Sequence, residues 1–304
     1  MESFKKRECE IWAIGGGKGG TGKSFVASNI GNYIARRGDR VVLIDADFGG
    51  ANLHTFLGIN KPKFSLTDFF ERRLSLAEII VDGTDPKMGF VSGDLQSFST
   101  DSIKHTQKVK LFGHIKALDT DYILIDLGSG THFNTLDTLL LADKMILVIV
   151  PEITSIENMY QFIKKALFRK LRTILNTHGL KDFAENTWKN RRTAGIRNIK
   201  EFVDFLKRSS PEVMNVLNDE LSNIKIYLIL NQVKKNEEIV IGNAVKSVCL
   251  KYFGLDVQYV GHIEHDDCVC NCINERKPFL SAYPLSRCTQ GLRIVAENLL
   301  GPNL

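Results

Sequence analysis

The chain has 304 residues, of which 43% are hydrophobic and 25% are charged. This composition is typical of a globular protein and excludes a disordered or fibrous chain. The longest uncharged apolar run, residues 145–150, is far shorter than the roughly 20 residues of a membrane-spanning helix. The charged N-terminus has no apolar segment after it, and the six cysteines show no disulfide pattern. We therefore expect a cytoplasmic location, with peripheral contact at the inner face of the membrane left open.

Charge is distributed unevenly along the chain. Forty Lys and Arg against 35 Asp and Glu give a net charge of +5. Residues 164–208 contain 13 basic and 4 acidic residues, a local net charge of +9, so the rest of the chain has a net charge of −4. A mildly acidic body with one basic segment suggests a separate role for that segment.

Short apolar runs alternate with helical patterns over the first half of the chain. Residues 11–14 form an expected buried strand, and residues 24–37 an expected helix with one apolar side. Further strands are expected at 40–44, 89–91, 122–125, 145–150, 225–230 and 257–263. These runs are continuously apolar rather than alternating, which indicates strands that are covered on both faces. The predicted fold is α/β, a doubly wound and mostly parallel sheet flanked by helices.

The spacing of strands breaks once, because residues 154–223 show helical patterns and no convincing strand. A single crossover connection needs far fewer residues. We therefore expect an ordinary crossover helix that is extended by a helical, partly basic insertion at residues 164–223. The whole chain, residues 1–304, is expected to form a single α/β domain that contains this insertion.

A Gly-rich loop follows the first strand and matches the phosphate-binding pattern G-x-x-x-x-G-K-[ST]. Its glycines allow the backbone N–H groups to wrap around a phosphate at the positive end of the following helix. Lys23 is expected to reach the β- and γ-phosphates, and Ser24 is expected to ligate Mg²⁺. The residues expected to bind nucleotide here are Gly17, Lys18, Gly19, Gly20, Thr21, Gly22, Lys23 and Ser24.

Acidic and amide side chains follow other expected strands. Asp126 ends the strand at 122–125 and is expected to hold the Mg²⁺ shell, through water, together with Ser24. The following residues, Gly128 and Gly130 among them, form a flexible stretch that is suited to sensing a γ-phosphate. Asp45 and Asp47 end the second strand, where they favour work on metal and water over simple helix capping.

The residues that would contact the base are less distinctive. The chain contains no Asn-Lys-x-Asp segment for reading guanine. Asn231 and Gln232 end the strand at 225–230, where they are placed to contact a base, so ATP is the expected nucleotide.

The loop at Lys18–Ser24 resembles the deviant Walker A motif of the MinD/ParA ATPases, whose mark is an extra lysine at the position of Lys18. The resemblance implies a Mg²⁺-dependent ATPase that forms an ATP-dependent homodimer, in which Lys18 reaches the partner's nucleotide. It also implies that Asp47 positions the attacking water, that Asp126 is the switch II acid and that Asn231 contacts adenine. The catalytic set is then Lys18, Lys23, Asp47 and Asp126, with slow hydrolysis until the dimer or a partner completes the site.

Within that family, residues 45–53 and 126–130 look most similar to FlhG-type regulators of flagellar number. Three features differ: the N-terminus lacks the FlhG activator segment, His54 replaces a usual aspartate, and no basic amphipathic tail follows the last core-type helix. The resemblance implies a switch that controls flagellum number or placement, or the division site, together with an unidentified protein partner or activator. The alternatives are an ATP-gated, DNA-binding partition protein of the ParA type and a metal-cluster carrier of the Mrp type.

Three interpretations of the basic segment remain open: a solvated helical surface, a contact with an anionic nucleic acid or membrane, and a contact with an acidic protein. In the second interpretation, Trp188 would stack on bases or insert into the partner. The residues of this candidate patch are Lys164, Lys165, Arg169, Lys170, Arg172, Lys189, Arg191 and Arg192.

Cys268, Cys270 and Cys272 suggest a metal site at first sight, because Mrp-type relatives carry iron–sulfur clusters. Their alternate spacing instead fits a helix that begins near Asp266 and Asp267, on which only Cys268 and Cys272 share a face. We therefore expect packed free thiols. Four histidines show no ligand spacing and are expected to be surface or cap residues: His105, His114, His132 and His178.

Overall fold

The computed structural model describes residues 9–47, 50–72, 74–94, 105–129 and 133–301. Its centre is an eight-stranded sheet with the strand order β3-β4-β2-β5-β1-β6-β7-β8. The strands are β1 (Glu10–Gly15), β2 (Val41–Ala46), β3 (Val81–Asp82), β4 (Met88–Val91), β5 (Tyr122–Leu127), β6 (Lys144–Ile149), β7 (Ile226–Val233) and β8 (Val257–Glu264). Neighbouring strands pair in parallel, except β3 with β4. The predicted mostly parallel, doubly wound sheet is confirmed.

Each of the seven expected strands is present within a few residues of its expected bounds. The structure adds β3, an antiparallel edge strand of two residues that the sequence did not reveal. Val81 and Asp82 are too short a run to show either the alternation or the continuous apolar character of a strand. Their pairing depends on β4, which offers its free edge.

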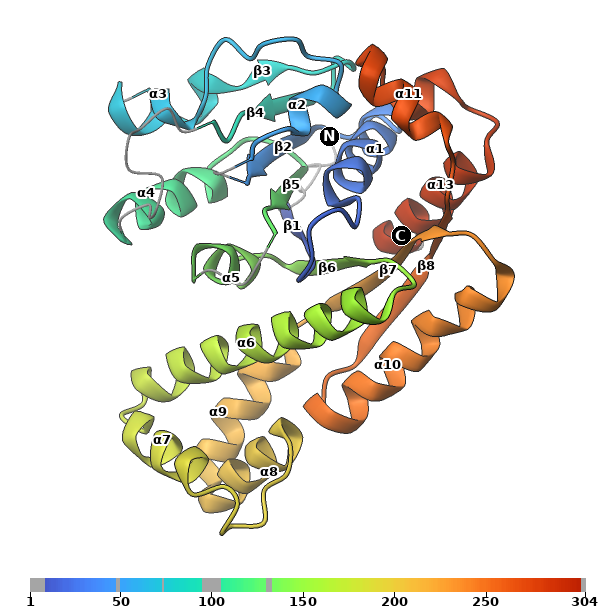
Figure 1. Cartoon of the computed structure of the whole chain (residues 1–304). Helices are drawn as coiled ribbons and strands as arrows, with labels where there is room; N and C mark the ends of the chain where they lie inside the picture. The colour runs from blue at the N-terminus through green and yellow to red at the C-terminus, as the bar shows by residue number, and fades with distance from the viewer. Residues whose placement is uncertain (1–8, 48–49, 73, 95–104, 130–132, 302–304) are drawn as a thin grey trace, which may run out of the picture.

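Helices cover both faces of the sheet (Figure 1). Those of the first half are α1 (Lys23–Arg36), α2 (Leu53–Phe56), α3 (Leu66–Glu71), α4 (His105–Lys116) and α5 (Phe133–Leu139), with a 3₁₀ turn η1 (Ala77–Ile79). Those of the second half are α6 (Ile153–Thr177), α7 (Lys181–Lys189), α8 (Ile199–Ser209), α9 (Pro211–Ser222), α10 (Val240–Phe253), α11 (Cys268–Glu275), α12 (Phe279–Ala282) and α13 (Arg287–Leu300), with η2 (Asn236–Ile239).

The continuous apolar strands arise because the two faces of the sheet supply two different cores. Trp12 and Ile14 of β1 pack on the side of α1, α12 and α13. Ile11 and Ala13 point to the opposite side, where α5, α6 and α10 pack. Successive side chains of a strand point to opposite faces, so a strand buried on both faces is apolar at every position.

Four helices, α6 to α9, connect β6 to β7, where one crossover helix would suffice. The first half of α6 packs on the sheet through residues such as Phe162 and Ala166. Its second half extends past the sheet, where α7, α8 and α9 cover it (Figure 1). Trp188 of α7 packs edge-on against Phe168 and Phe202, with ring centroids 4.6 and 5.0 Å away. An aromatic cluster thus joins α6, α7 and α8.

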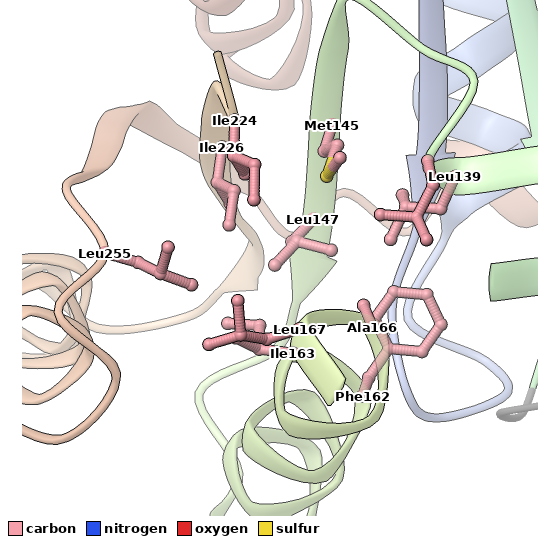
Figure 2. A pocket seen from close by; sticks show the side chains of 11 residues that line it. Leu139, Met145, Leu147, Phe162, Ile163, Ala166, Leu167, Ile224, Ile226 and Leu255 are labelled. Atoms are coloured by element: carbon pink, nitrogen blue, oxygen red, sulfur yellow. The ribbon is translucent and has the colours of Figure 1, made fainter. Parts of the chain in front are cut away.

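A small void lies between β6, β7 and the first half of α6 (Figure 2). Its volume is about 20 Å³, and Met145, Leu147, Phe162 and Ala166 are among the apolar side chains around it. A void of this size has room for about one water molecule, but water would find no hydrogen-bonding partner in it. It is therefore a packing defect of the core and not a ligand site.

Candidate nucleotide site

The phosphate-binding loop connects β1 to α1, as the sequence predicted. The loop ends at Gly22, whose φ of 87° lies in the left-handed region that glycine adopts without strain. At Gly17 a side chain has no room, because a Cβ atom would lie 2.1 Å from the carbonyl oxygen of Asn158 in α6. The loop glycines therefore serve both the left-handed turn into α1 and the close packing of the loop against α6.

Lys23 is the first residue of α1, and its side chain folds back over the loop. Its Nζ donates a hydrogen bond to the carbonyl oxygen of Lys18 at 3.2 Å, and only 8% of the residue is exposed. Burial lowers the pKa of Lys23, while the carboxylates of Asp126 and Asp47 oppose this shift. A buried cation beside two acids is placed to pair with an anion that enters the loop.

Asp126 is buried at the carboxyl end of β5, directly beside Asp45 of β2 in the sheet register. Burial, reinforced by Asp45, raises the pKa of Asp126, whereas Ser24 and Lys23 lower it. Within the described residues, its Oδ1 atom has no hydrogen-bond partner. A buried carboxylate oxygen without a partner beside a serine hydroxyl fits the water shell of Mg²⁺, which prefers oxygen ligands. The residues present thus fit the expected metal.

Asp45 shapes the segment that follows β2. Its Oδ1 accepts a hydrogen bond from the Asp47 N–H at 3.1 Å, and its Oδ2 accepts one from the Leu53 N–H at 3.0 Å. Burial raises the pKa of Asp45 to about 6, although these backbone bonds oppose the shift. Because both oxygens are used within the protein, Asp45 positions the loop that carries Asp47.

The Asp47 carboxylate lies against the backbone that follows Asp126. A Cβ atom on Gly128 would lie 2.8 Å from Oδ1 of Asp47, so only glycine lets the two segments approach this closely. Asp47 and Ser129 both line the cavity above the loop. The structure therefore brings the two expected switch segments into contact. Gly130, the other expected switch glycine, lies outside the described residues.

Lys18 points to α6 in the structure. Its Nζ lies 2.6 Å from Oε2 of Glu152 and donates to Oγ1 of Thr154 at 3.0 Å. Lys18 is not among the residues that line the cavity of its own loop. Sequence reasoning did not identify Glu152, which is 134 residues away from Lys18 along the chain.

Asn231 and Gln232 brace the phosphate-binding loop from β7. The Asn231 side-chain amide donates to the carbonyl oxygen of Thr21 at 2.9 Å, and that of Gln232 donates to the carbonyl oxygen of Gly20 at 3.1 Å. Gln232 has a φ of 57°, an uncommon conformation for a residue other than glycine. Both side chains also line the cavity above the loop.

The cavity has a volume of about 380 Å³ and extends from the loop to α11. This volume lies in the range typical of small-ligand sites. Its far wall contains side chains that sequence reasoning had not connected with the loop: Phe56, His265, Val269, Cys270, Ile273 and Cys288. Apolar side chains at the end opposite the phosphate loop could have been found only by knowing that α11, which follows β8, packs beside α2.

All six cysteines are free thiols. Helix α11 begins at Cys268, whose N–H donates to Oδ1 of Asp266 at 2.9 Å. Cys272 is buried and Cys270 is exposed, as their spacing on a helix requires. Across the described residues, no three His, Cys, Asp or Glu side chains are arranged to hold a metal ion. His114 stacks edge-on against Phe69, and Nδ1 of His178 is 2.9 Å from the Ile174 carbonyl oxygen; the side chains of His105 and His132 lie outside the described residues.

Several cations of the basic segment are already paired within the protein and are less available to an anionic partner than the sequence implied. Arg169 pairs with Asp137 at 2.8 Å, Lys170 pairs with Glu220, and Arg172 lies 3.9 Å from Glu185. Lys164 and Lys165 lie on α6, whereas Lys189, Arg191 and Arg192 lie at the end of α7 and just after it. The patch is therefore divided between two elements.

Trp188 packs inside the helical insertion, and its stacking on bases stays a prediction. The Trp188 ring is held between Phe168 and Phe202, and the Arg191 guanidinium lies 4.7 Å from the ring centre. Helices α6 and α8 therefore cover part of the ring, and the rest of it stays half-exposed.

Residues 12–279 match the family described as the CobQ/CobB/MinD/ParA nucleotide binding domain. The chain belongs to this family. Among curated relatives, the antiactivator FleN of Pseudomonas aeruginosa is 24% identical over 95% of this chain and 86% of its own length. The septum site-determining protein MinD of Helicobacter pylori is 33% identical over 49% of this chain and 55% of its own length.

Solved MinD structures share the fold over nearly the whole of the present chain. The MinD of Pyrococcus horikoshii, solved with Mg-ADP, superposes with a TM-score of 0.65 at 21% identity over 96% of both chains. The MinC:MinD complex of Aquifex aeolicus gives a TM-score of 0.63 at 21% identity over 97% of both chains. In the described part of the present chain, no helix is both long and apolar enough to cross a membrane.

Proposed function

We propose that this protein is a Mg²⁺-dependent ATPase that acts as a dimerisation switch. The observation that carries the proposal is the arrangement around the loop: Lys23, Asp47 and Asp126 converge at the phosphate end of the cavity, whereas Lys18 is held outside it. A single subunit thus has the groups for binding ATP but keeps one loop lysine turned away from the phosphates.

ATP binding follows from the loop and its acids. The backbone N–H groups at the start of α1 and the Lys23 ammonium group pair with the phosphate oxygens. Ser24 and Asp126 would hold Mg²⁺ through oxygen atoms and water, and this metal would neutralise charge on the β- and γ-phosphates. A cation bound here would also offset the repulsion of Asp126 by Asp45 and Asp47.

Asp47 is the group we assign to the attacking water. Its carboxylate lies above the loop, is kept in place by Asp45 and Gly128, and lines the cavity. A carboxylate in this position accepts a hydrogen bond from water and thereby directs a lone pair of the water oxygen to the γ-phosphate. Because phosphoryl transfer depends mostly on position and charge, a small displacement of Asp47 slows the reaction.

Lys18 completes the site only in a dimer. In the single subunit, Glu152 and Thr154 hold its ammonium group away from the cavity. When two subunits close face to face, each Lys18 would leave Glu152 and reach the partner's phosphates. Hydrolysis is then slow in the monomer and depends on assembly or on a partner that promotes it.

Adenine would occupy the end of the cavity near α11. Val269 and Ile273 offer apolar contacts to the base. Asn231 and Gln232 lie between this region and the loop, so their amide groups would contact the nucleoside while they brace the loop. The chain has no Asn-Lys-x-Asp segment for reading guanine, so ATP is the nucleotide that we propose.

The cellular role that we propose is control of the number or position of a cellular structure. The protein would exercise this control through a protein partner, in the cytoplasm or at the inner face of the membrane. Similarity to the FleN antiactivator over 95% of the chain and to MinD over half of it supports this role. A partition role on DNA draws less support, because Trp188 and several patch cations are already engaged. A role as metal-cluster carrier draws none from the cysteines, which form no metal-binding group in the described part of the chain.

The Lys18→Ala variant tests the proposal. We expect it to bind ATP as the wild type does and to lose hydrolysis by roughly 100-fold or more, the usual effect of removing a charge-stabilising donor. Binding would be measured with a fluorescent ATP analogue and hydrolysis by phosphate release. Lys116→Ala, a change of an exposed lysine on α4, is the matched control. Hydrolysis at the wild-type rate in Lys18→Ala would refute the role given to Lys18.

A further inference from the structure

A second cavity lies in the helical insertion, between α6, α7 and α8. Its volume is about 300 Å³, and it shares no lining residue with the nucleotide cavity. Six apolar side chains form its walls: Phe168, Leu171, Leu175, Ala184, Trp188 and Phe202. This volume is at the lower end of the range for small-ligand sites, and it is many times that of the void in the core.

The remaining lining residues are charged, and three of the four are cationic. They are Arg172, Lys181, Glu185 and Lys189. Arg172 and Glu185 lie 3.9 Å apart, which offsets one charge of each sign. Among the described residues, Lys181 and Lys189 form no ion pair with a carboxylate, so the cavity keeps two positive charges at its edge.

An apolar cavity edged by lysines favours a specific kind of ligand. The walls stabilise a hydrocarbon chain by removing it from water, at about 25 cal/mol for each Å² buried. Each of the two lysines can stabilise a negative charge at the edge. A nucleic acid fits poorly, because its charged phosphates and sugars would gain nothing from the apolar walls. A neutral hydrocarbon would leave the lysines unused.

We propose that this cavity, which we call the insertion pocket, binds a single-chain apolar anion of the fatty-acid class. The hydrocarbon chain occupies the space between Leu171, Ala184 and Trp188. The carboxylate head lies at the edge, where it pairs with Lys181 or with Lys189, which begin and end α7. Figure 1 places α7 and α8 at the end of α6 that is distant from the sheet, so the ligand binds without competing with the nucleotide.

The test is a titration of the full chain with sodium dodecanoate below its micelle concentration, followed by calorimetry and by tryptophan fluorescence. The second signal reports on the pocket because Trp188 is one of its walls and the other tryptophan, Trp12, is fully buried in the sheet. We expect saturable binding of dodecanoate. We also expect dodecanol to bind roughly tenfold more weakly and dodecyltrimethylammonium to show no saturable binding, since each lacks the charge that the lysines recognise.

Two kinds of variant separate the walls from the edge. Ala184→Phe fills the pocket, and we expect it to abolish binding. The double variant Lys181→Glu with Lys189→Glu leaves the walls intact and should weaken dodecanoate binding by about tenfold or more while it leaves dodecanol unchanged. Arg192→Glu with Arg197→Glu makes the same charge change on exposed residues that do not line the pocket, and it should bind dodecanoate as the wild type does.

Each alternative outcome overturns the proposal. The absence of saturable binding of free dodecanoate would do so, as would equal binding of the anionic, neutral and cationic chains. If the protein bound anionic vesicles or duplex DNA but no free dodecanoate, the insertion would act as a charged surface and the pocket would have no ligand of this class. Full binding in the lysine double variant would show that the edge does not recognise the head group, and thermal unfolding of each variant confirms that loss of binding is not loss of the fold.

Discussion

At the residue scale, the position of the Asp47 carboxylate depends on the absence of a side chain at Gly128. A side chain at Gly128 would push on the Asp47 carboxylate, because its Cβ would lie 2.8 Å from Oδ1. The Asp47 backbone N–H is held by Asp45, so the carboxylate would yield by rotating away from its present position. Catalysis by position therefore depends on a residue that touches no substrate.

We predict that Gly128→Ala lowers the rate of ATP hydrolysis roughly 10- to 100-fold, the scale of effect of a misplacement of about 1 Å. ATP affinity should stay near that of the wild type, because Lys23 and the loop amides are untouched. Phosphate release at saturating ATP measures the first quantity, and equilibrium binding measures the second. Gly113→Ala is the control, since no atom lies within 4 Å of its added Cβ. An unchanged rate would contradict the positioning role of Gly128.

At the scale of elements, Asp137 connects three helices. It lies on α5, and its carboxylate pairs with Lys108 of α4 at 2.7 Å and with Arg169 of α6 at 2.8 Å. Burial raises the pKa of Asp137, but the hydrogen bonds and charges of Arg169 and Lys108 outweigh it, so the pKa lies below its usual value. The helix that follows the expected switch II segment is thereby joined to α6.

We predict that Asp137→Asn lowers the free energy of unfolding by about 1–2 kcal/mol at neutral pH. A carboxyl whose pKa is depressed by folding contributes stability above its unfolded pKa, about 3.9, and loses this contribution as the pH falls through the folded value. The difference between variant and wild type should therefore shrink below about pH 4. Urea unfolding over a pH series measures it, and Asp256→Asn, at an exposed pair 3.8 Å apart, is the control. A difference that does not depend on pH would show that charge is not its cause.

The sequence was informative where a feature is local. Seven strands, the loop at Gly17–Ser24 and the acids at 45, 47 and 126 each depend on a short pattern and on the rule that parallel strands end at one edge. Contacts between distant residues could not be predicted in this way. Glu152 meets Lys18 across 134 positions, and Asn231 braces Thr21 across 210.

The basic segment shows the same limit at Trp188. The positive charge of the segment follows from the sequence alone. The exposure of the Trp188 ring depends instead on how α6, α7 and α8 pack against one another. Phe168 and Phe202, which hold it, lie on the preceding and the following helix, so no pattern near Trp188 reveals them. The insertion pocket is a product of the same packing and was likewise hidden.

At the scale of the whole molecule, α6 connects the sites. The helix has 25 residues, a length of roughly 37 Å at 1.5 Å per residue. Thr154 in its first turn holds Lys18 beside the phosphate loop, Arg169 in its middle pairs with Asp137, and its last turns form a wall of the insertion pocket. One continuous helix therefore contacts the phosphate loop at one end and the insertion pocket at the other.

The Asp47→Ala variant tests most directly whether two subunits assemble into a dimer when ATP is bound. This variant should bind ATP but not hydrolyse it, so the ATP-bound state persists long enough to be weighed. We predict that light scattering after size-exclusion chromatography gives the monomer mass of 34.2 kDa without nucleotide or with ADP, and about twice that mass with ATP and Mg²⁺. Adding Lys18→Ala to the variant should leave ATP bound but weaken the dimer. A variant that binds ATP and remains monomeric at every protein concentration would contradict the dimerisation switch.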